Sequence, residues 1–163
     1  MPIEDEHHPL MPSLLDRLLD DEPGQSTEPL WRGSYRLEQL HEDVRRDLES
    51  LLNTRHSRRD LLKAQGETAQ STLTYGLPDF TSWIGAGPEL QAQLRDELAS
   101  ALQAFEPRLT NVRVVVREPE QQYDRNIRLT IQAVLHVDPV VEAVTFDTVV
   151  EASTGSCEIQ ASS

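Results

Sequence analysis

The sequence predicts an α+β fold, in which N-terminal helices pack on one face of a small, mainly antiparallel C-terminal β-sheet. Two observations support this prediction. Apolar residues recur at helical spacing as far as residue 105, and from residue 112 onward they alternate with polar residues, as in half-buried strands. A Glu-Pro-Arg sequence at residues 106–108 separates the two halves, and its proline prevents the preceding helix from continuing.

Composition limits the classes of protein to which the chain can belong. A chain of 163 residues is long enough to bury a hydrophobic core. Its single cysteine, Cys157, excludes an internal disulfide and favours the reducing cytoplasm. No stretch approaches the ~18 apolar residues of a membrane span, so we expect no membrane insertion. The net charge of −13 argues against a nucleic-acid surface, because phosphate binding needs clustered Lys and Arg.

Residues 1–28 are predicted to form a flexible acidic tail, and residues 29–163 a single α+β domain. The tail carries a short amphipathic docking helix at about 13–20, with Ser13 as its N-cap and Asp16 three residues later. So short a helix is marginal alone in water, so we expect it to dock on its own domain or on another chain. Its apolar stripe consists of Leu14, Leu15, Leu18 and Leu19. The first three are candidate protein-binding residues.

Two longer helices and a structured loop follow. Ser34 can cap the first helix, and Asn53 can end it in the left-handed conformation. The second helix begins at Pro88, where a missing amide hydrogen is no loss. In the loop between them, Asp79 can cap one short helical turn that buries Phe80, Trp83 and Ile84. The apolar faces of the two helices are Leu37, Leu40, Val44, Leu48, Leu51 and Leu52, and then Leu90, Leu94, Leu98, Ala101, Leu102 and Phe105.

The C-terminal half contains four segments with the period of two that is typical of strands. Three have clear inward faces, and "SCEIQ" is a short last strand. The inward residues are Val112, Val114 and Val116, then Ile127, Leu129, Ile131, Ala133, Leu135 and Val137, and then Val144, Phe146 and Val150. The outward residues of the longest strand are Arg128, Thr130, Gln132 and His136.

The residues at the helix-to-strand junction are unusual for a simple turn. Glu106 lies at the negative end of the helix dipole, where a carboxylate is unfavourable. Pro107 makes the connection rigid, and Arg108 supplies five donors in a planar fork. Two interpretations remain open from the residue types alone. The two charged side chains either pair with each other and cap the helix end, or they are presented to a partner protein.

Catalytic and metal-binding patterns are absent from the sequence. There is no Gly-rich phosphate loop, GxSxG, HExxH or CxxC, and the five histidines share no metal spacing. We therefore expect no catalytic residue, metal or cofactor. A hydrolase with two carboxylates needs one of them in an apolar pocket, and the only candidate, Glu106, has Arg108 beside it. Six basic residues lie between Arg45 and Lys63, either as a site for an acidic partner or as a solvated helix end.

Four segments in this order point to a known family. They are "PSLLDRLLD", "VRRDLESLLNTR", "YGLPDF" and "FEPRL". Together they resemble the baseplate wedge subunit of bacterial type VI secretion systems, TssE, within the wider family of contractile-tail baseplate wedge proteins, formerly called lysozyme-like. The resemblance extends over most of the chain from about Pro12. The acidic residues before Leu10 match no part of it.

The resemblance implies a structural protein, not an enzyme, in the baseplate of a contractile injection machine. Its implied partners are other baseplate wedge subunits and contractile sheath subunits, with the central tube or spike as a further candidate. The family's Glu-Pro-Arg signature maps onto Glu106, Pro107 and Arg108 and implies a protein-binding role, so we expect these residues to pair with a neighbouring protein. Strand addition to the open sheet would template sheath polymerisation. The implied location is cytoplasmic, near the inner membrane. The alternatives are a peptidoglycan-degrading hydrolase and a free-standing protein-interaction module.

Overall fold

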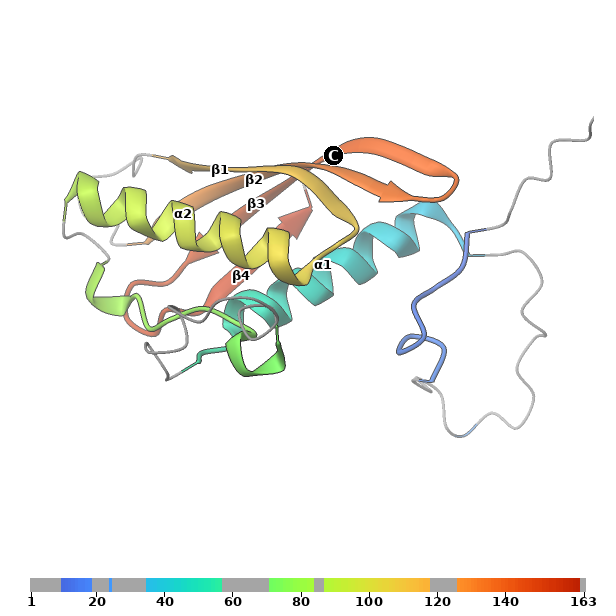
Figure 1. Ribbon diagram of the computed structural model, residues 1–163, viewed down its shortest axis with the longest axis horizontal. Coiled ribbons are helices and arrows are strands. Elements are labelled where there is room, and N and C mark those ends of the chain that lie inside the picture. Colours follow the sequence, from blue (N-terminus) through green and yellow to red (C-terminus); the bar gives the residue numbers. More distant parts are fainter. Residues whose placement is uncertain are drawn as a thin grey trace, which may run out of the picture.

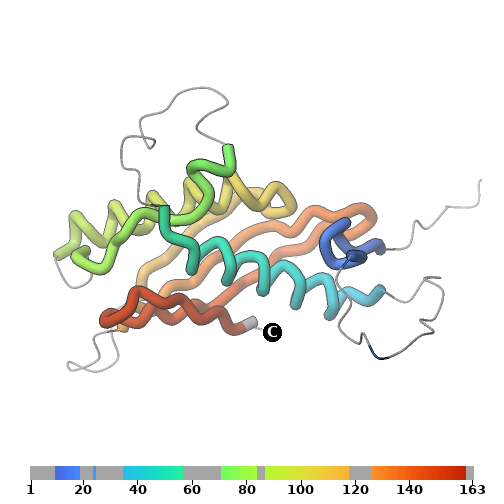
Figure 2. The backbone as a smooth tube through the Cα atoms, turned by 90° about the horizontal axis from the view of Figure 1, so that it is seen from below, coloured from blue at the N-terminus to red at the C-terminus, as the bar shows by residue number. Residues whose placement is uncertain are grey.

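The computed structural model describes residues 10–18, 24, 35–56, 71–83, 87–117 and 126–161. It consists of two layers, in which two helices lie side by side on one face of a four-stranded sheet (Figures 1 and 2). The α+β prediction, with helices first and strands second, is confirmed. The elements are α1 (Leu37–Asn53), η3 (Thr72–Thr74), η4 (Thr81–Trp83), α2 (Pro88–Phe105), β1 (Leu109–Arg117), β2 (Ile127–Val137), β3 (Val140–Val150) and β4 (Cys157–Ala161).

The sheet is an antiparallel meander in the order β1-β2-β3-β4. Its period-two pattern follows the predicted inward and outward faces, because successive side chains of a strand point to opposite sides. The register between β1 and β2 shifts between Thr110 and Arg113, and Asn111 there has a φ of 54°. Thr130 is on the outward face as predicted but is buried, and its hydroxyl is satisfied by donating to Asp147 Oδ1 at 2.9 Å on the neighbouring strand.

The core lies between the helices and the inner face of the sheet. The helical spacing predicts its residues well: the buried side chains of the two helices are Leu40, Val44, Leu48, Leu51 and Leu52 of α1, and Leu94, Leu98, Ala101 and Leu102 of α2. Leu37, Leu90 and Phe105 are half-buried at the ends of these stripes. Phe80 of the loop is buried as predicted and Trp83 half-buried, whereas Ile84 lies outside the described residues.

The ends of α1 differ from the prediction. Arg36 is the N-cap, and its amide donates to the side-chain oxygen of Gln39 at 2.9 Å; the predicted cap, Ser34, lies outside the described residues. Asn53 does not adopt the left-handed conformation, so that prediction is wrong. It remains helical, and Thr54 after it is extended. Its side chain instead bridges two elements, with Nδ2 donating to Cys157 O and Oδ1 accepting from the Cys157 amide, both at 2.8 Å.

In the described part of the loop between the helices, residues 71–83 contain two short 3-10 turns, η3 and η4, where one helical turn was predicted. Asp79 has the predicted capping role, since its Oδ1 accepts from the Thr81 amide at 3.1 Å. Pro88 begins α2 as predicted.

Candidate protein-binding site

The helix-to-strand junction begins where α2 ends. Glu106 has φ −121° and ψ 80°, outside the helical region as predicted for a residue before proline. Its amide still donates to Leu102 O at 2.9 Å, and its carbonyl accepts from the Leu109 amide at 3.0 Å. Both backbone groups of Glu106 are therefore satisfied within one turn. The chain passes directly from α2 into β1.

The side chains of Glu106 and Arg108 pair with each other. Nε of Arg108 donates to Oε1 of Glu106 at 2.7 Å, and Nη2 donates to Oε2 at 2.6 Å. This bidentate arrangement is among the strongest hydrogen-bonded pairs in proteins. Glu106 is only 5% exposed, and a carboxylate buried to that extent needs a partner within reach. Within this single chain the two side chains thus pair with each other, as in the first interpretation, and their contact with a neighbouring protein stays a prediction.

Arg108 also connects the junction to α1. Its Nη2 donates to Oδ2 of Asp47 at 2.6 Å, across 61 positions of sequence. The hydrogen bonds to Glu106 raise the pKa of Arg108 against the opposing effect of burial, and Asp47 raises it further. The guanidinium is consequently charged at neutral pH. One cation thus joins the start of β1 to the middle of α1.

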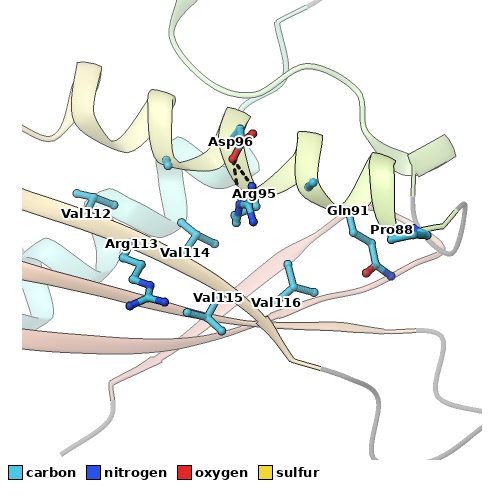
Figure 3. A pocket seen from close by; sticks show the side chains of 11 residues that line it. Pro88, Gln91, Arg95, Asp96, Val112, Arg113, Val114, Val115 and Val116 are labelled. Atoms are coloured by element: carbon cyan, nitrogen blue, oxygen red, sulfur yellow. Dashed lines mark hydrogen bonds and ion pairs between the residues drawn. The ribbon is translucent and has the colours of Figure 1, made fainter.

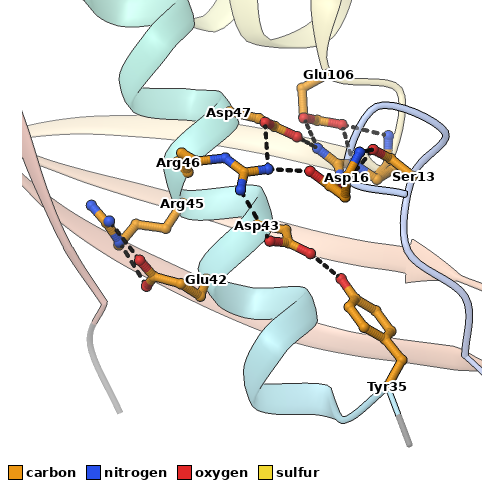
Figure 4. Close-up of polar contacts among 10 residues, drawn as sticks. Ser13, Asp16, Tyr35, Glu42, Asp43, Arg45, Arg46, Asp47 and Glu106 are labelled. Carbon is orange, nitrogen blue, oxygen red and sulfur yellow. Dashed lines mark hydrogen bonds and ion pairs between the residues drawn. The ribbon is translucent and has the colours of Figure 1, made fainter. Parts of the chain in front are cut away.

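The ion pairs continue from Asp47 to Arg46, which lies among three carboxylates (Figure 4). Its Nη2 binds the carboxylate of Asp16 and lies 3.7 Å from Oδ1 of Asp47. Its Nη1 lies 3.5 Å from Oδ1 of Asp43. We refer to these residues as the ion-pair network: Asp16, Asp43, Arg46, Asp47, Glu106 and Arg108.

Tyr35 adds a neutral group at one end of this network. Its hydroxyl donates to the carboxylate of Asp43 (Figure 4). Burial, followed by this contact with Asp43, raises the pKa of Tyr35, so the phenol remains protonated and continues to donate. The contact ties the residues just before α1 to its second turn.

The N-terminal segment, residues 10–18, is held on α1 by Asp16. Ser13 Oγ donates to Oδ2 of Asp16 at 2.6 Å and accepts from the Asp16 amide at 3.2 Å, so the two residues interact at the predicted spacing. Burial alone would raise the pKa of Asp16, but the hydrogen bonds from Ser13 and Arg46 outweigh it, so this pKa lies below its usual value. The carboxylate is ionised at neutral pH and faces the guanidinium of Arg46.

The predicted leucine stripe faces solvent. Leu14, Leu15 and Leu18 are 77%, 61% and 82% exposed, whereas Pro12 is buried and Leu10 packs against the core. Residues 14–18 form turns and no α-helix, because so few residues cannot repay the cost of helix nucleation. The predicted docking helix is therefore wrong as far as Leu18, and residues 19 and 20 lie outside the described part.

The sequence does not identify the residues that connect these candidates. Asp43, Arg46 and Asp47 are spaced so that they share one helix face, which is a signal that the sequence does contain. That this face meets Asp16 on one side and Arg108 on the other depends on the tertiary fold. Asp16 of the leucine-bearing segment and Arg108 of the Glu-Pro-Arg junction thus both bind α1.

The basic cluster between Arg45 and Lys63 is used internally where the structure describes it. Arg45 pairs with Glu42 at 2.6 Å and Glu49 at 2.9 Å. Arg55 stacks over the ring of Phe80, with its guanidinium carbon 4.5 Å from the ring centre. The other three basic residues lie within 57–70, outside the described part. The described arginines therefore do not form a site for an acidic partner here.

The site offers little to a catalytic mechanism. Both oxygens of Glu106 accept hydrogen bonds from Arg108, so this carboxylate is not available for proton transfer. Over the described ranges, no three His, Cys, Asp or Glu side chains are grouped as they would be around a metal ion. Over the same ranges, no helix has the length and apolar character needed to span a bilayer.

Comparisons with known proteins give one family model and one similar fold. A family model described as "Baseplate wedge protein gp25" matches residues 38–140, which is more than half of the chain. One chain of a solved structure, "The baseplate complex from the type VI secretion system", has the same fold with a TM-score of 0.50 and 22% identity, over 70% of this chain and 96% of that one. No curated protein matches. The chain belongs to the family of the baseplate wedge protein gp25.

Proposed function

We propose that this chain is a structural component of the baseplate of a type VI contractile injection machine, where it joins the wedge and templates sheath polymerisation. Its partners are then other baseplate wedge subunits and contractile sheath subunits, with the central tube or spike as a further candidate. It acts in the cytoplasm near the inner membrane and needs no cofactor. Membership of the family and the likeness to a chain of a baseplate complex support this proposal.

The observation that carries the wedge-joining role is the ion-pair network. Arg46 holds the N-terminal segment through Asp16, and Asp47 holds the Glu-Pro-Arg junction through Arg108. Within that junction Glu106 is buried and Pro107 is exposed. Glu106 and Arg108 therefore position the junction, and Pro107 is the residue offered to a partner.

The second contact surface is the row of apolar side chains on the N-terminal segment. Met11 is 57% exposed, and Leu14, Leu15 and Leu18 are more exposed still. Four large apolar groups within eight residues form a patch of the kind that marks protein–protein contacts. The segment is anchored by Leu10, Pro12 and Asp16, so the patch is presented in a defined orientation. Ordering before contact lowers the entropic cost of binding.

Templating of the sheath is supported by the architecture of the sheet. An antiparallel meander has two edge strands, β1 and β4, and an edge strand with unpaired main-chain groups can accept a strand from another protein. Sheath subunits that add strands in this way would begin their ordered growth on the baseplate.

The wedge-joining role can be tested by replacing Leu14, Leu15 and Leu18 together with serine. These side chains are exposed, so we expect the variant to fold normally. In cells that carry the secretion system, it should no longer copurify with other wedge subunits, and fluorescently labelled sheaths should disappear.

Leu73→Ser is the matched control, because Leu73 is 60% exposed but lies in η3, away from the N-terminal segment. It should assemble normally. Normal wedges and sheaths in the triple variant would refute the role of the leucines. A chain whose deletion leaves sheath assembly unchanged would refute the proposed function as a whole.

A further inference from the structure

The two edges of the sheet are not equivalent, and β4 is the closed one. The amide and the carbonyl of Cys157 both bond to the side chain of Asn53 at 2.8 Å. Farther along the strand, Nη1 of Arg45 donates to the carbonyl of Ile159 at 3.3 Å. Both side chains come from α1, which runs beside β4 (Figure 2). An incoming strand would have to displace these contacts to pair with β4.

The opposite edge, β1, is open. Within the described ranges, no hydrogen bond is made to the outward-facing amide and carbonyl groups of β1 from Val112 to Arg117. A groove of about 540 Å³ lies along this edge, between β1 and α2. Six residues of strand extend about 20 Å, which is long enough to pair with one ordinary strand.

The groove is apolar on its inner side (Figure 3). Val112, Val114 and Val116 point from β1 toward α2, and the facing helix contributes two small residues, Ala92 and Ala99. These alanines leave room for side chains of an added strand. The polar residues of α2 at the groove are Gln91, Arg95 and Asp96.

The outer face of β1 is cationic beside this groove. Arg113 points away from α2, is exposed, and forms no ion pair with any described residue (Figure 3). Arg95 on the helix side pairs with its sequence neighbour Asp96 at 2.9 Å. In a chain with a net charge of −13, an exposed arginine with no carboxylate partner among the described residues favours an acidic group in a strand that binds at this edge.

We propose that the outer edge of β1 accepts one extended segment of a partner protein, in which apolar residues alternate with others and a carboxylate lies opposite Arg113. The apolar side chains of the added strand face Ala92 and Ala99. The side chains between them lie on the outer face of the sheet, beside Arg113. Main-chain hydrogen bonds to β1 supply affinity, and this alternation supplies specificity. The inference rests on the proposed templating role and identifies both the edge that is used and the chemistry of the added strand.

Site-specific photo-crosslinking in the full-length chain tests the choice of edge. A benzoylphenylalanine replaces Gln91 in the groove or, as the matched control, Gln160 on β4. In cells that assemble the machine, the probe at position 91 should form an adduct that peptide mass spectrometry maps to a segment with the alternating apolar and acidic pattern. The probe at position 160 should form none with that segment.

Charge reversal tests the proposed chemistry. Arg113→Glu should lower the yield of the adduct at position 91 about tenfold, because like charges oppose binding. Glu158→Lys, an exposed charge reversal on β4, should leave that yield unchanged.

The possible failures are distinguishable. An adduct with the segment only at position 160, no adduct at 91, or an adduct at 91 that Arg113→Glu leaves unchanged would each overturn the inference. If the unaltered chain does not copurify with other wedge subunits, the proposed function fails instead. An adduct at 91 with a segment of the stated pattern would still support the inference in that case.

Discussion

Arg46 of α1 binds the carboxylate of Asp16, thirty positions earlier in the chain. This contact joins the N-terminal segment to the network that also holds the Glu-Pro-Arg junction. Because Arg46 is shared among three carboxylates, the loss of any one leaves it other partners nearby. We therefore expect that the N-terminal segment can detach from α1 while the core remains folded.

Asp16→Asn should loosen the N-terminal segment without changing global stability. The side chain of Arg46 is 46% exposed, so solvent screens its ion pair with Asp16. We therefore expect the segment to lose about 1 kcal/mol or less of docking free energy. Hydrogen exchange of residues 10–18 should accelerate, while the urea midpoint of the whole protein stays the same. Arg17→Gln is the control, because Arg17 forms no ion pair with a described residue. Equal exchange rates in the two variants would contradict the assigned role of Asp16.

Acid should have the same effect as Asp16→Asn. The folded pKa of Asp16 lies below its ordinary value of 3.8, so its contribution is complete above that value and is lost as the pH falls through the lowered pKa. Exchange of residues 10–18, corrected for intrinsic rates, should be constant from pH 5 to 7 and should accelerate below about pH 4. In Asp16→Asn this acid-dependent step should be absent. A step of the same size in that variant would assign it to another group.

Glu106→Ala should destabilise the whole protein. It leaves Arg108, whose side chain is only 22% exposed, with Asp47 as its remaining partner. Removing one member of a largely buried pair costs about 3 kcal/mol, which corresponds to roughly 10 °C in Tm for a domain of this size. Thermal unfolding followed by circular dichroism measures the change.

The double variant Glu106→Leu with Arg108→Met separates stability from assembly. Replacing both charges by apolar groups of similar size should restore most of the Tm, because the buried charges are both removed, while Asp47 is 34% exposed and still lies 3.7 Å from Arg46. If this stable variant still fails to form sheaths, the charges have a role in positioning Pro107 for a partner. If it forms normal sheaths, the charges of Glu106 and Arg108 contribute only to stability. The position of Pro107 then does not depend on these charges.

The part of the fold that depends on periodicity could be predicted from the sequence. Helical spacing and alternation identified Leu48, Leu98 and Ile131 as core residues, because these periods are fixed by backbone geometry. The contacts that make the site could not be predicted. Arg108 binds Asp47 across 61 positions of sequence, and Asn53 binds Cys157 across 104 positions. No local sequence pattern encodes contacts between residues so far apart in the chain. Asn53 shows the consequence, since its residue type equally suits a left-handed helix end and a side-chain bridge.

Asn53→Ala should open the β4 edge. The substitution leaves the amide and the carbonyl of Cys157 without their partner, and each unsatisfied buried group costs about 1–3 kcal/mol. We expect a lower Tm and, because an edge strand is uncovered, concentration-dependent self-association in analytical ultracentrifugation. Gln103→Ala, at an exposed position of α2, is the control. A stable, monomeric Asn53→Ala variant would show that α1 does not protect this edge.

Gly76→Ala should be more harmful than Gly87→Ala, although both glycines have similar positive φ values of 103° and 108°. A Cβ at Gly76 would lie 2.5 Å from the carbonyl oxygen of Thr54, which accepts from the Leu77 amide at 2.9 Å. A Cβ at Gly87 meets no described atom within 4 Å. Gly87→Ala should therefore cost only backbone strain, about 1 kcal/mol. Gly76→Ala adds a clash with backbone and should cost at least about 3 kcal/mol, the upper end for strain alone. Urea unfolding of the two variants measures the difference, and equal midpoints would mean that residues 54–56 and 76–77 move apart easily.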